Sequence, residues 1–206
     1  AYFDGGKDNW LEAPNIPLDG KPFAISMWVR PTGTHPMYGL IEQKDADRVN
    51  RWLHVMLRGG RQPYLGFYIN DAISPRDIPV NRWSHLVFQY RDGRQEIWMN
   101  GSFMCARKAK AYGGKSGTLR IGYTPPWNNV PSRNFEGYMR ELRIYGRALA
   151  NDEIFNLFTG KRLSARVAAD QDLQPVLDLP TVAHETPATI NGAPFLSIDG
   201  KRLLIT

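Results

Sequence analysis

The chain has 206 residues, of which 42% are hydrophobic and 12% aromatic, enough for one full-sized domain plus an extension. Fifteen prolines and nineteen glycines interrupt any long helix, and no run approaches the roughly 20 apolar residues that a membrane span needs. The net charge of +6 favours anionic partners only weakly, because the basic residues are scattered along the chain.

Other features of the sequence narrow the class of protein further. No basic helix or aromatic–basic RNA-binding signature is visible, so nucleic acid is not the expected partner. The single cysteine, Cys105, excludes an internal disulfide, and its neighbours predict a small buried side chain on a strand. Two basic clusters, 107–110 with Lys115 and 161–162 with Arg166, are interpreted as solvated charge that protects a sheet edge, with an acidic polysaccharide as the alternative partner. Because the chain begins at Ala1, we interpret it as a processed or excised segment.

Alternating apolar and polar residues predict antiparallel strands through about residue 160. Residues 22–31 and 51–61 each place a row of apolar side chains on one face and a mixed row on the other. The mixed rows carry Trp28, Arg30, His54 and Arg58. Further strands are expected within 64–71, 118–124 and 135–146. This alternation is typical of sheets that cover a core on one side.

Residues 81–101 predict a β-hairpin around Asp92-Gly93, a dipeptide suited to a two-residue turn. That turn sets the register, so Leu86 is expected opposite Met99 and Phe88 opposite Ile97. One face of the hairpin is then apolar.

A single short helix is predicted at residues 151–159. Asn151 is expected to cap it, Asp152 and Glu153 lie near its positive end, and Gly160 is placed to end it.

After about residue 163 the chain changes character. Residues 163–194 contain several prolines among small and polar residues and predict a linker or wrapping segment. Residues 195–206 predict a hairpin at Asp199-Gly200, which either docks on the first domain or begins a further one. The many apolar side chains of this tail favour packing against the domain, a protein partner or a neighbouring domain.

The segment WSHLVFQYRDGRQEIWMNG at 83–101 resembles a hairpin of the laminin G-like and pentraxin-like members of the concanavalin A-like lectin/glucanase group. Phe3-Asp4-Gly5 with Asp8 is similar to the opening strand of that family, and 134–154 is similar to its closing strand and helix. The resemblance covers about residues 1–162. It implies an all-β fold, an antiparallel jelly-roll β-sandwich with one short helix and an extended C-terminal tail.

The resemblance does not settle the activity, since members include binding modules, adhesion domains and some catalytic enzymes. Catalytic members carry closely spaced carboxylates along one strand, and residues 42–47 lack that spacing. The chain contains no Gln-x-His pattern, and its four histidines have no metal-ligand spacing. We therefore expect no catalytic residue within 1–162, while a role in a larger enzyme stays open.

Two surfaces are predicted to bind a ligand. In the loop 124–133, Trp127 lies between prolines, where a stiff exposed ring would stack on a sugar. Hydrogen-bonding groups lie close to it in the sequence, namely Tyr123, Asn128, Asn129 and Arg133. The alternative is that Trp127 folds back as a lid over the end of the sandwich. The second surface is the mixed face with Trp28, Arg30, His54 and Arg58, unless the C-terminal segment covers it.

The resemblance also implies one structural calcium ion, held by oxygen ligands near the chain ends. The carboxylates expected to hold it are Asp4, Asp8, Asp45 and Asp47. The alternative for Asp4 and Asp8 is a role in turns through their own side-chain hydrogen bonds.

Together these features predict a non-catalytic carbohydrate-binding or adhesion module of a secreted, periplasmic or cell-surface protein. Its expected partner is a polysaccharide or other glycan, neutral or acidic. Two alternatives stay open. One is an accessory domain of a larger glycoside hydrolase or polysaccharide lyase, and the other is a structural protein-interaction domain that binds no sugar.

Overall fold

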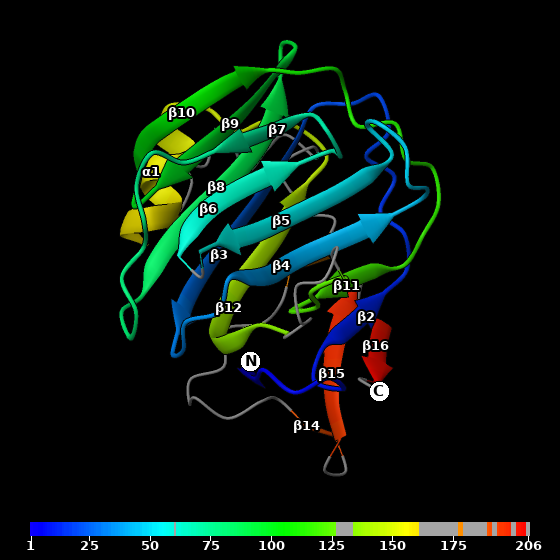
Figure 1. Ribbon diagram of the computed structural model, residues 1–206, viewed down its shortest axis with the longest axis vertical. Helices are drawn as coiled ribbons and strands as arrows, with labels where there is room; N and C mark the ends of the chain where they lie inside the picture. The colour runs from blue at the N-terminus through cyan, green and yellow to red at the C-terminus, as the bar shows by residue number, and fades with distance from the viewer. Residues whose placement is uncertain are drawn as a thin grey trace.

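The structure is a computed structural model that describes residues 1–59, 61–126, 134–160, 177–178, 189–190, 193–198 and 201–204. Within these residues the chain forms two large antiparallel sheets packed face to face, with one short helix on the outside and a small third sheet near the C-terminus (Figure 1). The predicted all-β sandwich is therefore confirmed.

The larger sheet has seven strands. Its order is β1 (Tyr2–Asp4), β12 (Glu136–Tyr145), β3 (Phe23–Pro31), β8 (Ser84–Arg91), β9 (Arg94–Met99) and β10 (Ser102–Lys108), and β13 (Leu177–Asp178) also pairs with β12. The six-stranded sheet, in front in Figure 1, runs β2 (Leu11–Ala13), β11 (Leu119–Ile121), β4 (Met37–Lys44), β5 (Trp52–Arg58), β6 (Gln62–Gly66) and β7 (Asp71–Ile73). A small sheet holds β14 (Thr189–Ile190), β15 (Ala193–Ile198) and β16 (Lys201–Leu204).

The core lies between the two large sheets and is built from the apolar rows that the alternation predicts. On β3 the inward row is Phe23, Ile25, Met27 and Val29, and on β5 it is Leu53, Val55 and Leu57, all fully buried. Each such side chain contributes about 1.5–3 kcal/mol of transfer free energy when buried. Because both inner faces are filled this way, the alternate residues of each strand must lie on the outer faces.

The β8–β9 hairpin has the predicted register, with Leu86 opposite Met99 and Phe88 opposite Ile97. Asp92 and Gly93 form its turn with positive φ angles of 49° and 70°. Two successive positive φ angles characterise the type I′ turn, whose twist matches that of the flanking strands.

The predicted strand at 64–71 is instead two strands, β6 and β7, joined by a tight turn. Tyr68 and Ile69 have φ angles of 71° and 57°, which reverse the chain there. Positive φ is unfavourable for a β-branched residue such as Ile69, so the local sequence does not announce this turn.

Helix α1 spans Asn151–Thr159, the predicted range, and ends at Gly160 in the left-handed conformation. The predicted N-cap was wrong: Ala150, not Asn151, occupies that position. Alanine has no acceptor, and the carboxylate of Glu153 accepts a hydrogen bond from the Ala150 N–H at 2.7 Å instead. Arg147 holds the same carboxylate at 2.7 Å, which orients it for this role.

Helix α1 packs on the outer face of the seven-stranded sheet (Figure 1). Ile154 is buried with Val87 and Trp98 of that sheet. Phe158 stacks on Trp28, with ring centroids 5.8 Å apart and an interplanar angle of 27°. The helix therefore covers part of the outer face of the seven-stranded sheet and lies on the opposite side of the sandwich from the outer face of the six-stranded sheet.

The C-terminal strands include the predicted hairpin pairing, with Leu196 opposite Leu203 and Ile198 opposite Lys201. The turn residues Asp199 and Gly200 lie outside the described residues. The division of the chain after residues 162 and 194 stays a prediction.

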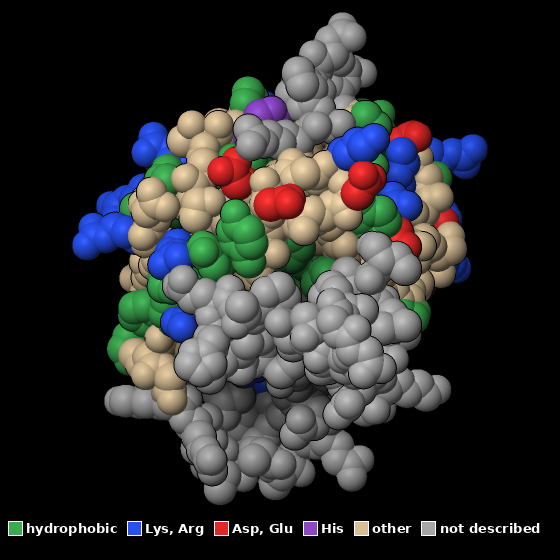
Figure 2. Space-filling view, turned by 90° about the horizontal axis from the view of Figure 1, so that it is seen from below, with side chains coloured by type: hydrophobic (Ala, Val, Ile, Leu, Met, Phe, Trp, Pro, Cys, Tyr) green, Lys and Arg blue, Asp and Glu red, His purple; other side chains and the backbone are tan. Residues whose placement is uncertain are grey.

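Edge strand β10 carries the cysteine and the first basic cluster. Cys105 is half-buried rather than buried as predicted, and its thiol donates a hydrogen bond to the carbonyl oxygen of Ile73 at 3.3 Å. Burial raises the pKa of the Cys105 thiol, which keeps it protonated. Arg107 and Lys108 are exposed at the end of this strand. On the face seen from below in Figure 2, described Lys and Arg side chains flank acidic ones rather than forming one basic patch.

Acid sensitivity is expected from His85, which is buried beneath α1 and accepts or donates a hydrogen bond with the Ser26 hydroxyl at 2.9 Å. Burial lowers the pKa of His85 to about 4, and the positive charge of Arg143 acts in the same direction. The unfolded chain binds this proton near pH 6.5, so the stabilisation is complete above pH 6.5 and is lost as pH falls toward 4.

We expect His85→Gln to reduce the slope of unfolding free energy against pH by about 1.4 kcal/mol per pH unit in that window. Urea unfolding at half-unit pH intervals measures the slope. Ser26→Ala is the control, because it removes the hydrogen-bonding partner and retains the imidazole, and it should keep the wild-type slope. An unchanged slope in His85→Gln would show that another group titrates.

Candidate ligand-binding face

A row of polar residues crosses the outer face of the six-stranded sheet. The strand register aligns one residue of each strand with one residue of the neighbouring strand. Every residue of the resulting row except Gly66 has a charged or polar side chain. From β2 to β7 it consists of Glu12, Arg120, Glu42, His54, Gly66 and Asp71. We call this set the polar row.

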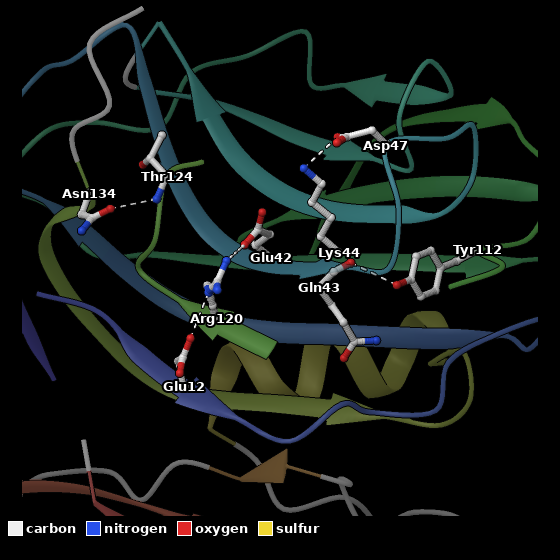
Figure 3. A network of polar contacts seen from close by, with 9 residues as sticks. All are labelled: Glu12, Glu42, Gln43, Lys44, Asp47, Tyr112, Arg120, Thr124 and Asn134. Atoms are coloured by element: carbon white, nitrogen blue, oxygen red, sulfur yellow. Dashed lines mark hydrogen bonds and ion pairs between the residues drawn. The ribbon is translucent and has the colours of Figure 1, made fainter. Parts of the chain in front are cut away.

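Arg120 links the two carboxylates at one end of the polar row (Figure 3). Its Nε lies 3.0 Å from Glu12 Oε1, and its Nη1 lies 3.2 Å from Glu42 Oε2. Burial raises the pKa of Glu42, and the neighbouring Arg120 opposes that effect. Both carboxylates are therefore held in ion pairs and are not positioned as a free acid and base.

A pocket of about 220 Å³ opens at the other end of the polar row. Its lining residues come from β4, β5, β6 and β7 and are Met37, His54, Met56, Arg58, Tyr64 and Asp71. Pockets that enclose drug-sized ligands usually measure roughly 300–1,000 Å³. This one has room for a single small group, such as one ring of a longer ligand.

Aromatic rings form the floor of the pocket. His54 stacks on Tyr64 with centroids 5.5 Å apart and an interplanar angle of 22°, and its other neighbour is Trp52 at 5.5 Å. The Arg58 guanidinium lies 5.4 Å from the centre of the Tyr64 ring. Since Arg58 is exposed and the rings are buried, the charged donors lie at the rim and the apolar surface lies beneath.

The pocket also contains hydrogen-bonding groups of both kinds. The His54 Nδ1–H donates to the Trp52 carbonyl at 3.0 Å, and Nε2 lies 3.8 Å from Asp71 Oδ1. Burial lowers the pKa of His54 to about 4, although Asp71 opposes this, so the imidazole is neutral at pH 7 with Nε2 as an acceptor. Burial and a hydrogen bond to Asp71 raise the pKa of Tyr64, which keeps its hydroxyl a donor.

Gly66 makes this arrangement sterically feasible. A Cβ at that position would lie 2.1 Å from His54 Nε2 and 2.7 Å from Asp71 Oδ1. The missing side chain in the polar row is therefore what lets the histidine and the aspartate approach each other.

The base of the predicted binding loop lies beside the pocket. The Gly39 N–H donates to Thr124 Oγ1 at 2.7 Å, and a Cβ on Gly39 would collide with the Tyr123 carbonyl. Asn134 closes the other end of the loop, because its Oδ1 accepts a hydrogen bond from the Thr124 N–H at 3.0 Å (Figure 3). Met56 of the pocket pairs with Gly39, so the loop leaves the sheet next to the pocket.

Tyr123 packs edge-on against Trp10 at 5.4 Å, with the Arg120 guanidinium 4.9 Å from its ring centre. The other predicted loop residues, Trp127, Asn128, Asn129 and Arg133, lie outside the described residues.

The predicted second surface does not exist as a single face. Trp28 and Arg30 lie on the outer face of the seven-stranded sheet, whereas His54 and Arg58 lie on the outer face of the six-stranded sheet. The core separates the two pairs. Their alternation is the same because every strand of a sandwich has one outward row, and alternation alone cannot tell which sheet a strand joins.

The four aspartates expected to bind calcium have other roles where their contacts are described. Asp4 Oδ1 accepts the Gly6 N–H at 2.7 Å, which is the turn role considered as the alternative. Asp47 pairs with Lys44 at 2.7 Å (Figure 3). Asp45 bonds to Ser116 and Arg51, and these hydrogen bonds lower the pKa of its carboxyl.

Within the described part of the chain, no three His, Cys, Asp or Glu side chains gather closely enough to hold an ion. The expectation of calcium stays a prediction without support from their geometry.

The sequence does not single out five of the residues at the pocket, namely Met37, Met56, Tyr64, Gly66 and Asp71. They lie within ordinary strand patterns, and only the unpredicted turn between β6 and β7 brings Asp71 beside Gly66. No spacing in the sequence signals this neighbourhood.

The two packed sheets define the class of the protein as an antiparallel jelly-roll β-sandwich. A family model described as the concanavalin A-like lectin/glucanases superfamily, of laminin G type, matches residues 4–155. The chain belongs to this superfamily, as the resemblance predicted.

Several solved structures share the fold. Domain 4 of the extracellular arabinanase AbnA from Geobacillus stearothermophilus, solved in complex with arabinotriose, is 18% identical with a TM-score of 0.60, covering 76% of this chain and 74% of that one. A candidate carbohydrate-binding protein from Bacteroides ovatus is 12% identical with a TM-score of 0.68, covering 95% and 55%. A pentraxin from Limulus polyphemus is 13% identical with a TM-score of 0.58, covering 76% and 80%. At these identities the likeness shows the fold.

No helix within the described ranges is both long and apolar enough to cross a membrane.

Gly66→Ala tests the geometry of the pocket. We expect it to destabilise the protein by about 1–3 kcal/mol, because the added methyl group must displace His54 or Asp71 from a packed site. Gly146→Ala is the matched control, since a Cβ there meets nothing within 4 Å, and it should change stability by less than about 0.5 kcal/mol. Denaturant unfolding measures both, and equal effects would contradict the steric argument.

Arg120→Met tests the ion pairs of the polar row. It removes the ion-pair partner of the buried Glu42 carboxylate, and we expect the free energy of unfolding to fall by about 3 kcal/mol, the low end for a buried pair because Arg120 is one-third exposed. Arg61→Met breaks the exposed pair with Asp77 and should cost at most about 1 kcal/mol. A loss in Arg120→Met no larger than in this control would mean that Glu42 does not depend on Arg120.

Proposed function

We propose that this chain is a non-catalytic carbohydrate-binding module, and that it binds its glycan on the outer face of the six-stranded sheet. The observation that carries this proposal is the mixture of groups in one pocket. An aromatic floor, a neutral histidine acceptor, an Asp71 carboxylate and the Arg58 donors lie together around Tyr64. A sugar presents apolar ring faces and hydroxyls that both donate and accept, so it is complementary to this mixture.

The loop after Thr124 extends the proposed site. Trp127 supplies a stacking ring, and Asn128, Asn129 and Arg133 supply hydrogen bonds to the same ligand. The described base of the loop supports this, because Thr124 is bonded to Gly39 beside the pocket. The ligand would then occupy the pocket with one ring and continue toward the loop.

The non-catalytic part of the proposal is supported by the carboxylates. Among the described residues that line the pocket, Asp71 alone carries a carboxylate. Glycoside hydrolysis ordinarily uses two carboxyl groups on either side of the scissile bond. Glu12 and Glu42, which share the face, are paired with Arg120.

The parent protein is proposed to be secreted, periplasmic or cell-surface. Domain 4 of an extracellular arabinanase has the same fold and was solved with arabinotriose, which favours an accessory domain of a larger polysaccharide-degrading protein as the specific form of this role.

A glycan array followed by calorimetry with the best oligosaccharide, arabinotriose included, tests the proposal. We expect Tyr64→Ala and Trp127→Ala each to weaken binding about tenfold or more, because each removes an aromatic contact surface. Arg61→Gln lies outside the pocket and should bind like the wild type.

Retention of full affinity by Tyr64→Ala would place the ligand elsewhere. Absence of any glycan binding together with a tight protein partner would support the structural alternative. Release of new reducing ends from a bound glycan by the purified chain would overturn the non-catalytic assignment.

A further inference from the structure

The opposite outer face, on the seven-stranded sheet, holds two arginines between aromatic rings. The Arg30 Cζ lies 4.2 Å from the ring centre of Tyr138 and 5.7 Å from that of Trp83. The Arg140 Cζ lies 4.5 Å from the centre of the same Trp83 ring and 5.2 Å from that of Trp28. Rings and guanidinium groups therefore alternate, and we call this set of five residues the cation–π ladder.

Strand register explains the spacing of the ladder. Arg30 pairs with Tyr138, and Arg140 pairs with Trp28, so the two arginines are diagonal neighbours on β3 and β12. Diagonal neighbours across an antiparallel pair have side chains about 7–8 Å apart. The sheet thus holds two guanidinium groups one short step apart.

The ladder is open to solvent although its rings are packed. All five residues are half-buried, and the Arg140 side chain is 38% exposed. Helix α1 bounds one end of the ladder, where Phe158 stacks on Trp28. Toward the other end the Tyr2 ring lies 4.9 Å from the Tyr138 ring and is tilted from it by 43°. The ladder is thus a partly exposed surface that is bounded at its two ends by Phe158 and Tyr2.

The chemistry of the ladder differs from that of the pocket. The guanidinium groups lie over the ring faces, which leaves less ring surface for stacking a sugar. A guanidinium that stacks on a ring keeps its N–H groups at its edge, and that edge suits two parallel hydrogen bonds to a carboxylate or sulfate. Glu141 lies 3.9 Å from Arg140 Nε and 3.3 Å from Arg143 Nη1, so this region already holds one carboxylate between two arginines.

We propose that the cation–π ladder is a second ligand site, which binds adjacent carboxylate or sulfate groups of an acidic polysaccharide through Arg30 and Arg140. Because both arginines are positively charged, a complementary ligand is anionic. The choice of a polysaccharide over an acidic protein segment rests on the proposed function. The two sites face opposite directions, so one module could join a hydroxyl-rich chain to an acidic one.

The test measures binding to heparin and to polygalacturonate by biolayer interferometry at low and at physiological salt. We expect Arg30→Gln with Arg140→Gln to weaken binding to the preferred polyanion about tenfold or more, because two charge-assisted pairs are lost. Lys108→Gln with Lys110→Gln removes the same charge from another basic cluster and should weaken binding by less than about threefold. Equal losses in the two double variants would show that net charge alone attracts the polyanion and would overturn the proposal.

A second pair of substitutions separates recognition from folding. Arg30→Lys with Arg140→Lys keeps the charge and loses the planar edge, so we expect it to fold and to bind more weakly than the wild type by about tenfold. Full affinity in this variant would contradict edge-on recognition. Melting temperatures of all variants identify any loss that comes from unfolding.

The same variants and binding measurements also distinguish this proposal from the proposed function. Tyr64→Ala should lose the oligosaccharide of the pocket and keep the polyanion, and the Arg30/Arg140 variants should do the reverse. If the protein binds a polyanion but no oligosaccharide binds in the pocket, the ladder remains supported as a polyanion site and the proposed function of the pocket is wrong. Tighter binding to poly-glutamate than to either polysaccharide, or binding to neither polysaccharide, would overturn the ladder as a glycan site.

Discussion

The burial of one row of side chains from each strand between the two sheets is the constraint on which the rest of the structure depends. Once Ile25, Met27, Val55 and Leu57 lie inside, every residue between them must lie outside. Antiparallel pairing then aligns these outward residues across neighbouring strands. A slip of one residue would exchange the two rows and place charged groups in the core, so the hydrophobic core also sets the chemistry of both surfaces.

The two outer surfaces use this alignment in different ways. On the six-stranded sheet, Arg120 of the polar row forms ion pairs with two carboxylates. At the other end of the row, Asp71 and the neutral imidazole of His54 line the pocket. On the seven-stranded sheet, the Trp83 ring lies between Arg30 and Arg140. In both places charge is held close to apolar surface, where electrostatic and hydrogen-bonding interactions are stronger than in open water.

The pocket combines rigidity with mixed chemistry. Its rings are packed against one another, and Gly66 provides the space in which His54 and Asp71 meet. Backbone and side-chain bonds at Thr124 tie the base of a loop to the neighbouring strand. Groups held in this way lose little conformational freedom when a ligand binds, which lowers the entropic cost of binding.

Local patterns in the sequence determined the strand alternation, the register of the β8–β9 hairpin, the bounds of α1 and the family, because each depends on residues close in the chain. Tertiary structure alone decided which strands are neighbours. It separated Trp28 from His54 and brought Asp71 to His54 through a turn with unfavourable φ angles. These outcomes depend on contacts between distant segments, and the same alternating pattern is compatible with either sheet.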